Sequence, residues 1–161
     1  MTDIKVVPQS SMSADVVSGV AQFLGPIVVD LTALAVDGKQ AHWHVRGANF
    51  QAVHELLDSV VDHAHDYADT AAERVVALGL PLDVRIQTVG AKASTSKLDA
   101  GFQQSDVVIA QIIASIDAVL VNVRTAIDEL GTLDAASQDV AIEIARGLEK
   151  DRWFLFAHLA G

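Results

Sequence analysis

Two pairs of long helix-forming segments, divided by one long connection, limit most strongly how this 161-residue chain can fold. The first pair covers residues 13–44 and 49–79, and the second covers 105–131 and a segment that starts at Thr132 or Asp134 and runs to 161. These segments are rich in Ala, Val, Leu and Ile at helical spacing, and the chain has only three prolines. Short links within each pair predict antiparallel neighbours, so we expect an all-α four-helix bundle.

Residues suited to cap or stop a helix mark the limits of the four segments. We expect Ser13, Asn49 and Ser105 to cap the starts of the first three helices. Gly79 and Gly131 are expected to end the second and third helices. A single long crossover between the second and third helices is typical of the ferritin-like form of the bundle.

The composition excludes several classes of protein. The chain has no cysteine, so histidine and carboxylate are the strong metal ligands that remain. The net charge of −10 disfavours a general attraction to nucleic acid or to anionic membranes. We recognise neither a signal peptide nor a membrane-spanning segment, which predicts a cytoplasmic protein. Residues 1–12 are expected to form a flexible arm, and residues 13–161 a single bundle domain.

Histidine and acidic residues share one face of the second predicted helix. On a helical wheel they fall within about 100° of one another. The residues on this face are His54, Asp58, Asp62, Asp69 and Glu73. A solvated polar face would explain such a stripe, but solvated faces usually mix Lys or Arg with their acids. The first basic residue here is Arg74, and acids without basic neighbours favour a bound cation.

The spacing of these residues requires a second copy of the chain. His54 and Asp58 lie one helical turn apart, as do Asp69 and Glu73. The two pairs are separated by about 16 Å along the helix, which is too far for one metal ion to bind both. Two copies of the helix, antiparallel about a two-fold axis near residues 63–64, would bring the pairs together.

The ligand types narrow the choice of metal. Imidazole combined with carboxylate suits iron, zinc or manganese, and His42 is a natural further ligand. The Glu-x-x-His motifs of di-iron bundles are missing, so we do not expect a metal centre inside one subunit. The stretch HELLD differs from the zinc-protease motif His-Glu-x-x-His in its last residue, Asp58.

The segments HWHVRGANFQAVHELLD and DYADTAAERVVALG closely resemble the Dps family, the mini-ferritins of bacteria. The resemblance covers residues 13–161, including RTAIDEL and EKDRWFLFAHL. It implies a hollow dodecamer that oxidises Fe(II), preferably with hydrogen peroxide rather than dioxygen, and stores the ferric mineral. Such a ferroxidase protects the cell from oxidative damage. The implied ligands are His42, His54 and Asp58 of one subunit, with Asp69 and Glu73 of its partner.

The resemblance also implies roles outside this ligand set. Trp43 matches a tryptophan beside the site that could intercept radicals, although packing at a dimer interface explains it equally well. His44 and His65 are candidate extra ligands, for which a supporting or solvated role is favoured. The three-fold pores of the family are lined by aspartates near the start of the fourth helix. The candidates here are Asp128, Asp134 and Asp139.

Two other functions fit the same residues. The first is compaction of DNA, for which family members often use arms rich in Lys or Arg. Residues 1–12 hold one Lys and one Asp, which disfavours this function. The second is metal-dependent hydrolysis of an amide or ester, because the same ligands can activate water. The sequence leaves the oxidant, the iron capacity and any second activity open.

Overall fold

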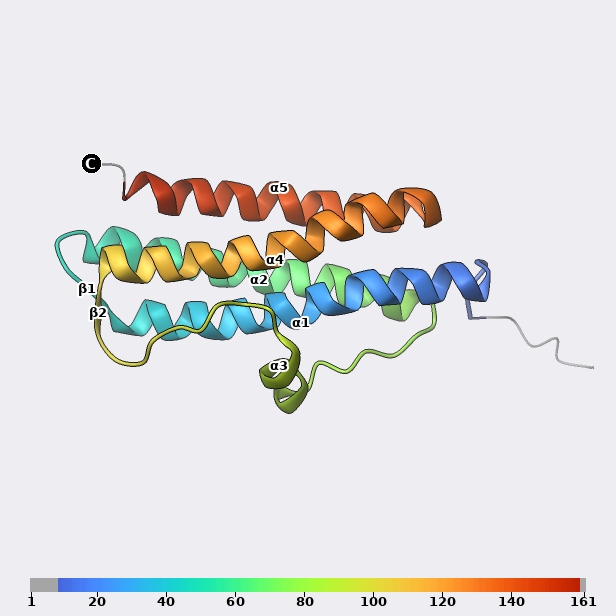
Figure 1. The fold of residues 1–161 in the computed structure, drawn as a ribbon, viewed down its shortest axis with the longest axis horizontal. Helices are drawn as coiled ribbons and strands as arrows, with labels where there is room; N and C mark the ends of the chain where they lie inside the picture. The colour runs from blue at the N-terminus through green and yellow to red at the C-terminus, as the bar shows by residue number, and fades with distance from the viewer. Residues whose placement is uncertain (1–8, 160–161) are drawn as a thin grey trace, which may run out of the picture.

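The computed structural model of the protein describes residues 9–159, which form the predicted four-helix bundle (Figure 1). Its long helices are α1 (Ala14–His44), α2 (Phe50–Ala77), α4 (Ser105–Leu133) and α5 (Ala135–Ala157). Helices α1 and α2 run antiparallel, as do α4 and α5, and the crossover returns along the bundle so that α2 and α4 point the same way. This is the ferritin-like connectivity. Residues 1–8, the larger part of the predicted arm, lie outside the described residues.

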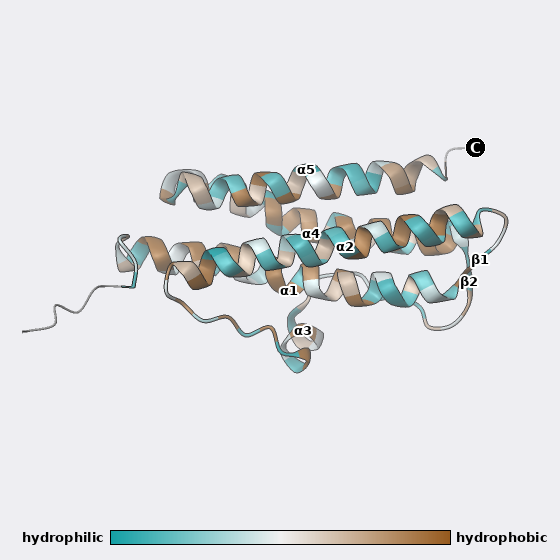
Figure 2. Cartoon of the chain, turned by 180° about the vertical axis from the view of Figure 1, so that it is seen from behind, coloured by the Kyte–Doolittle hydropathy of each residue, from teal (hydrophilic) through white to brown (hydrophobic). Residues whose placement is uncertain are grey.

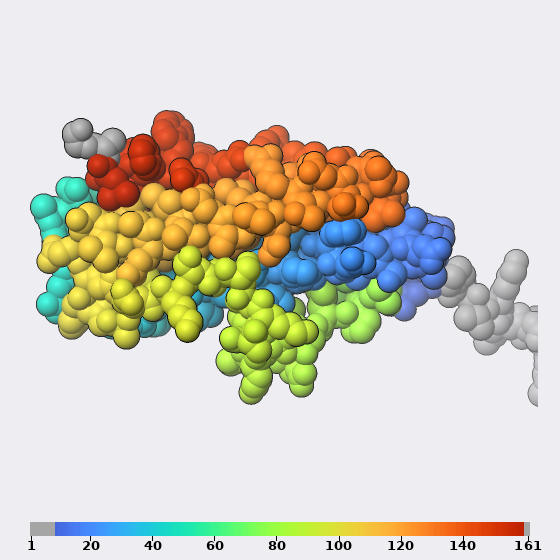
Figure 3. All heavy atoms as spheres, viewed as in Figure 1, coloured from blue at the N-terminus to red at the C-terminus, as the bar shows by residue number. Residues whose placement is uncertain are grey.

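The crossover carries one short helix, α3 (Ile86–Lys92), which stands out from the body of the bundle beside α1 (Figure 3). At its end, β2 (Gln103–Gln104) pairs in parallel with β1 (Val45–Arg46), the two residues that follow α1. The sequence did not predict this pair, because two residues cannot show an alternating pattern. The pairing joins the end of α1 to the start of α4.

The core lies between the four long helices, each of which buries apolar residues against the others. Figure 2 shows that hydrophobic and hydrophilic residues alternate along these helices. Helices α1 and α4 are long and apolar enough to cross a membrane by length and composition alone, which the sequence analysis did not anticipate. Within the bundle, α1 buries Leu24, Ile27 and Leu31 completely. Helix α4 likewise buries Ile112 and Ile116. Packing in a protein core therefore accounts for the apolar composition of both helices.

A buried carboxylate fastens the crossover to the bundle. Asp30 on α1 is 1% exposed and accepts hydrogen bonds from the backbone N–H of Ser94 at 2.7 Å and from its hydroxyl at 2.6 Å. Asn122 on α4 donates a third bond at 2.7 Å. Burying a carboxylate is costly unless it is hydrogen-bonded, and these three donors meet that need.

The ends of the first two long helices largely follow the sequence signals. The Ser13 hydroxyl accepts a bond from the N–H of Val16 at 3.4 Å, which confirms it as the cap of α1. Helix α2 ends just before Gly79, whose φ of +102° is the left-handed conformation expected after a helix. Asn49 occupies the predicted N-cap position of α2. Its side chain makes no capping hydrogen bond, so the prediction that it caps the helix is wrong.

The third long helix does not end where predicted, but the fourth starts after Asp134, one of the two residues expected to begin it. Helix α4 begins at Ser105 itself, with Gln104 at the capping position. It also continues through Gly131, because a glycine weakens a helix without forcing it to stop. The break falls at Asp134, whose side chain accepts the N–H of Ser137 at 2.9 Å and caps α5.

Candidate metal centre

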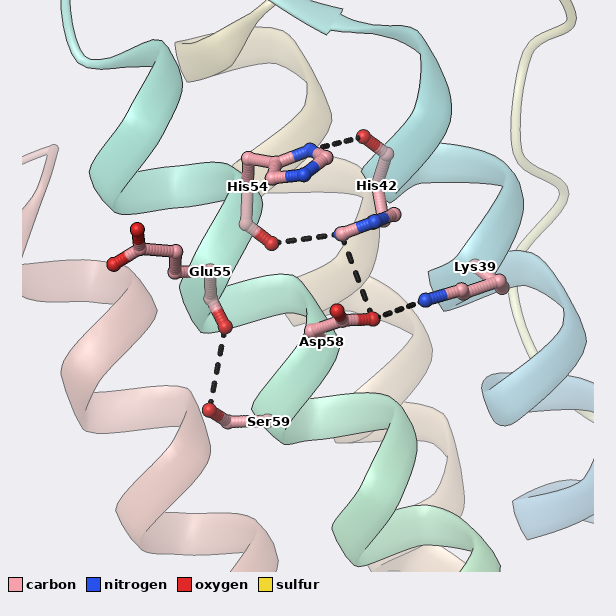
Figure 4. A network of polar contacts seen from close by, with 6 residues as sticks. All are labelled: Lys39, His42, His54, Glu55, Asp58 and Ser59. Carbon is pink, nitrogen blue, oxygen red and sulfur yellow. Dashed lines mark hydrogen bonds and ion pairs between the residues drawn. The ribbon is translucent and has the colours of Figure 1, made fainter.

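His42, in the last turn of α1, and His54, near the start of α2, bring their rings together where the two helices meet (Figure 4). The rings stack with centroids 3.6 Å apart and planes inclined by 22°. His42 Nδ1 lies 2.8 Å from the backbone oxygen of His54, and His54 Nδ1 lies 2.8 Å from that of His42. A carbonyl oxygen only accepts, so each Nδ1 carries a proton. In each neutral ring the lone pair is therefore on Nε2, as a metal ligand requires.

The link between α1 and α2 makes this meeting possible. Gly47 adopts a φ of +121°, which an L side chain rarely tolerates, and so turns the chain back within a few residues. Phe50, one turn before His54 on α2, places its ring centroid 5.1 Å from the imidazole. The turn and this ring position His54 over the end of α1.

Asp58 completes the group and is held by a lysine that the sequence analysis missed. Its Oδ1 lies 3.6 Å from His42 Nδ1 and forms an ion pair with Lys39, which lies one turn before His42 on α1 (Figure 4). The hydrogen bond from Lys39, aided by the nearby histidines, holds the pKa of Asp58 below its ordinary value. The acidic stripe is thus compensated at this one position from the neighbouring helix. The sequence signal for this ion pair was the spacing of Lys39 and His42, which lie one turn apart on α1.

Glu55 follows His54 in the stretch that resembles the zinc-protease motif. Its carboxylate points away from the two histidines in Figure 4 and accepts a bond from Gln51 at 3.0 Å. The arrangement of a zinc protease, with a glutamate beside the metal ligands, is therefore not formed here.

Asp69 and Glu73 lie farther along α2 and are exposed. Neither carboxylate forms an ion pair or hydrogen bond with another side chain in residues 9–159. Within the same range, no three His, Asp or Glu side chains are placed to hold a metal ion together. One chain thus brings His42, His54 and Asp58 close to one another and leaves Asp69 and Glu73 apart, as the spacing predicts.

The other aromatic and histidine candidates separate into two groups. His44 donates from Nδ1 to the backbone of Gln40 at 2.8 Å, and its ring lies 5.3 Å from Phe102, so it faces away from His42. Trp43, which is 62% exposed, and His65 line a cavity of about 430 Å³ between α1 and α2. This cavity adjoins the metal-ligand candidates, because Lys39 also lines it.

Only two of the three predicted pore aspartates have carboxylates open to solvent. Asp128 and Asp139 are exposed on α4 and α5. Asp134 instead receives a hydrogen bond from Arg74 Nη2 at 2.6 Å in addition to capping α5. Burial raises the pKa of this carboxyl, but the bonds from Ser137 and Arg74 outweigh it and bring the pKa below its ordinary value. Asp134 is therefore engaged within its own chain, which argues against a role in a pore.

A second histidine–carboxylate pair lies on the opposite side of α2 and was not predicted. His63 Nδ1 is 2.9 and 3.0 Å from the two carboxylate oxygens of Asp151 on α5. Asp151 is 2% exposed, and burial raises its pKa although the charge on His63 opposes this effect. The pair ties α2 to α5 and has no contact with the candidate centre.

Comparison with known proteins gives consistent matches for this fold. The model of the ferritin-like domain matches residues 24–161. A "DNA protection during starvation protein" of Mycolicibacterium smegmatis is 36% identical over 146 residues, which cover 88% of this chain and 78% of that protein. A protein of the same description from Agrobacterium fabrum is 33% identical and covers 94% of each chain.

Among solved structures, Dps from Microbacterium arborescens in its high iron form superposes with a TM-score of 0.92. It is 58% identical to this chain in sequence, and the match covers 94% of this chain and 99% of that one. The similarity therefore extends through all four long helices, including the segments that carry the histidine pair and the acidic stripe.

Proposed function

The chain belongs to the Dps family of ferritin-like proteins, and from this premise we propose that it oxidises Fe(II) and stores the ferric product. The observation that carries the proposal is the mutual fixing of His42 and His54 near Asp58: the Nδ1 of each ring bonds a carbonyl, and neither Nε2 forms a hydrogen bond within residues 9–159. A histidine that donates its other ring nitrogen to a carbonyl is the usual form of a metal ligand. Iron is the substrate and cargo of this site.

The site is proposed to form between two subunits whose α2 helices lie antiparallel. His42, His54 and Asp58 of one subunit then face Asp69 and Glu73 of the partner subunit. The exposure of both partner carboxylates, and their lack of side-chain bonds in the described chain, support this arrangement. The contact is isologous, so each dimer would carry two identical sites.

In the proposed reaction the ligands bind Fe(II) and hydrogen peroxide accepts its electrons. Neutral imidazoles and carboxylates bind two Fe(II) ions, which suits the borderline and hard ligands of this set. Hydrogen peroxide takes one electron from each ion and, with two protons, becomes two water molecules. Its two-electron reduction avoids the hydroxyl radical that a single electron would release. Lys39 must release Asp58 for an ion to bind there, and Trp43 lines the same cavity as Lys39.

We further propose a cytoplasmic dodecamer whose interior stores the ferric mineral and whose pores admit Fe(II) past Asp128 and Asp139. The relatives are named for DNA protection. Removing Fe(II) and peroxide would protect DNA without contact. Direct binding is disfavoured by a net charge of −10, so no retardation of DNA is expected in a gel at physiological salt.

An anaerobic titration with Fe(II), followed by peroxide, tests the proposed activity. The wild-type protein should oxidise iron in a saturable step that His54→Ala and Glu73→Ala abolish. Glu129→Ala, which removes an exposed acid on α4, is the matched control and should oxidise iron normally. Wild-type rates in both site variants would refute the assignment, and a stable monomer on sedimentation would refute the shared site.

A further inference from the structure

Two ligand-type residues on the acidic face of α2 have no part in the proposed oxidation. Asp62 and His65 are both exposed, and neither forms an ion pair or hydrogen bond in the part of the chain that the structure describes. Both line the cavity of about 430 Å³ between α1 and α2, together with Lys39 and Trp43. The Lys39 ammonium is already paired with Asp58, so it does not neutralise Asp62.

The register of the proposed dimer places these two residues at its centre. The pairings His54 with Glu73, and Asp58 with Asp69, are both centred between residues 63 and 64. Asp62 and His65 are centred on the same point, so Asp62 of each subunit would face His65 of the partner subunit. On the helical wheel both fall within the stripe formed by the other ligands, between about 20° and 80° from His54.

The four side chains would lie close enough to share one ion. Asp62 and His65 are three residues apart, so the two facing pairs are separated by about 4.5 Å along the helices. Two imidazoles and two carboxylates around a two-fold axis match the tetrahedral preference of a divalent transition ion such as Zn²⁺. No single chain can form this site, in agreement with the absence of any three-ligand group within residues 9–159.

We propose that each dimer binds one divalent transition-metal ion on its two-fold axis, through Asp62 and His65 of both subunits. This inference rests on the proposed function, because it uses the same antiparallel pairing of α2. The ion would lie about 11 Å along α2 from each oxidation site and would bridge the two subunits. Four protein ligands leave no open position, so the ion is structural.

Zn²⁺ is the probe, because it binds these ligands without redox chemistry. Metal-free assembled protein is dialysed against Zn²⁺, and bound metal is counted by elemental analysis. His65→Gln and Asp62→Asn should each lose one Zn²⁺ per two subunits relative to wild type and should still oxidise Fe(II). Glu129→Gln should retain the wild-type count. Co²⁺ should give the strong visible absorption of a four-coordinate ion in His54→Ala and lose it when His65→Gln is added.

The two proposals fail in different ways. Equal Zn²⁺ counts in wild type, His65→Gln and Asp62→Asn would overturn the axial site, whatever the oxidation rate. Normal oxidation by His54→Ala and Glu73→Ala would instead overturn the proposed function. Sedimentation of every variant confirms that a lost ion does not reflect a lost assembly.

Discussion

His42 and His54 hold each other in one tautomer, because the Nδ1 of each lies 2.8 Å from the backbone oxygen of the other. The two bonds join the last turn of α1 to the start of α2. The same contact therefore fixes the angle between two helices and aims two Nε2 atoms. The proposed metal binding is therefore coupled to the packing of the two helices, and a substitution at either residue should affect both.

His42→Ala tests this coupling. The variant loses one proposed ligand and one of the two hydrogen bonds that join α1 to α2, which should cost about 0.5–1.5 kcal/mol of stability. Its affinity for Zn²⁺ should fall by about 10- to 100-fold or more. Urea unfolding and calorimetric titration measure the two effects. His44→Ala is the control, since His44 bonds only within its own helix turn and should leave Zn²⁺ affinity unchanged.

Mixing two inactive variants tests whether the oxidation site is shared. In a dimer of His54→Ala with Glu73→Ala, one site combines the intact halves of both chains and the other combines both lesions. Unfolding and reassembling an equal mixture should therefore restore about a quarter of the wild-type sites. Saturable iron oxidation after anaerobic loading measures the recovery. No recovery in correctly assembled shells would place all the ligands within one subunit.

Lys39→Met should strengthen metal binding at neutral pH and shift its acid limit. The ammonium competes with a metal ion for Asp58, so its removal should raise Zn²⁺ affinity several-fold at pH 7. The same ammonium is the main cause of the lowered pKa of Asp58. Without it that pKa rises, so the carboxylate protonates, and binding weakens, at a higher pH than in wild type. Titrations between pH 4 and 7 should show both changes, whereas a uniform loss of affinity would contradict them.

The helix order, and the closeness of His54 to Asp58, could be predicted because local spacing determines them. Hydrophobic periodicity and short links define the bundle, and residues one turn apart on a helix necessarily share a face. The separation of Asp58 from Asp69 also follows from the helical rise, and the proposal of a site shared by two subunits rests on that separation.

The contacts that were missed all depend on how separate helices meet. Lys39 reaches Asp58 across the α1–α2 interface, and Arg74 reaches Asp134 across the α2–α5 interface. The sequence marks Asp134 as a possible helix start but not as a partner of Arg74, so it did not separate this engaged acid from the exposed Asp139. Such pairings depend on the rotation of each helix within the bundle, which side-chain packing sets.

Asp151→Asn should change how stability depends on pH. Burial raises the pKa of Asp151 in the folded protein, so ionising it costs free energy. The protonated acid therefore stabilises the folded wild-type protein at low pH. This contribution is lost as pH rises through the raised pKa. Asparagine cannot ionise, so the variant should gain stability relative to wild type as pH rises from 4 to 7. Urea unfolding at several pH values measures the difference.

His63→Ala should act in the opposite direction to Asp151→Asn. It removes the group that offsets the burial of the Asp151 carboxylate, so the loss of stability with rising pH should become steeper than in wild type. Identical pH profiles for the two variants and wild type would contradict a role for this pair in linking α2 to α5.

Substitutions of Asp134 and Asp139 should have different effects, although both residues are acids near the start of α5. The first should change stability and the second iron uptake. Asp134→Ala removes the α5 cap and the ion pair with Arg74, so it should lower the free energy of unfolding by about 1–2 kcal/mol. Asp139→Asn removes an exposed charge and should leave stability within about 0.5 kcal/mol of wild type. If Asp139 lines an iron pore, its loss should slow Fe(II) uptake by assembled protein while oxidation by pre-loaded sites stays normal. Stopped-flow uptake and urea unfolding, measured on both variants, separate a pore acid from a structural one.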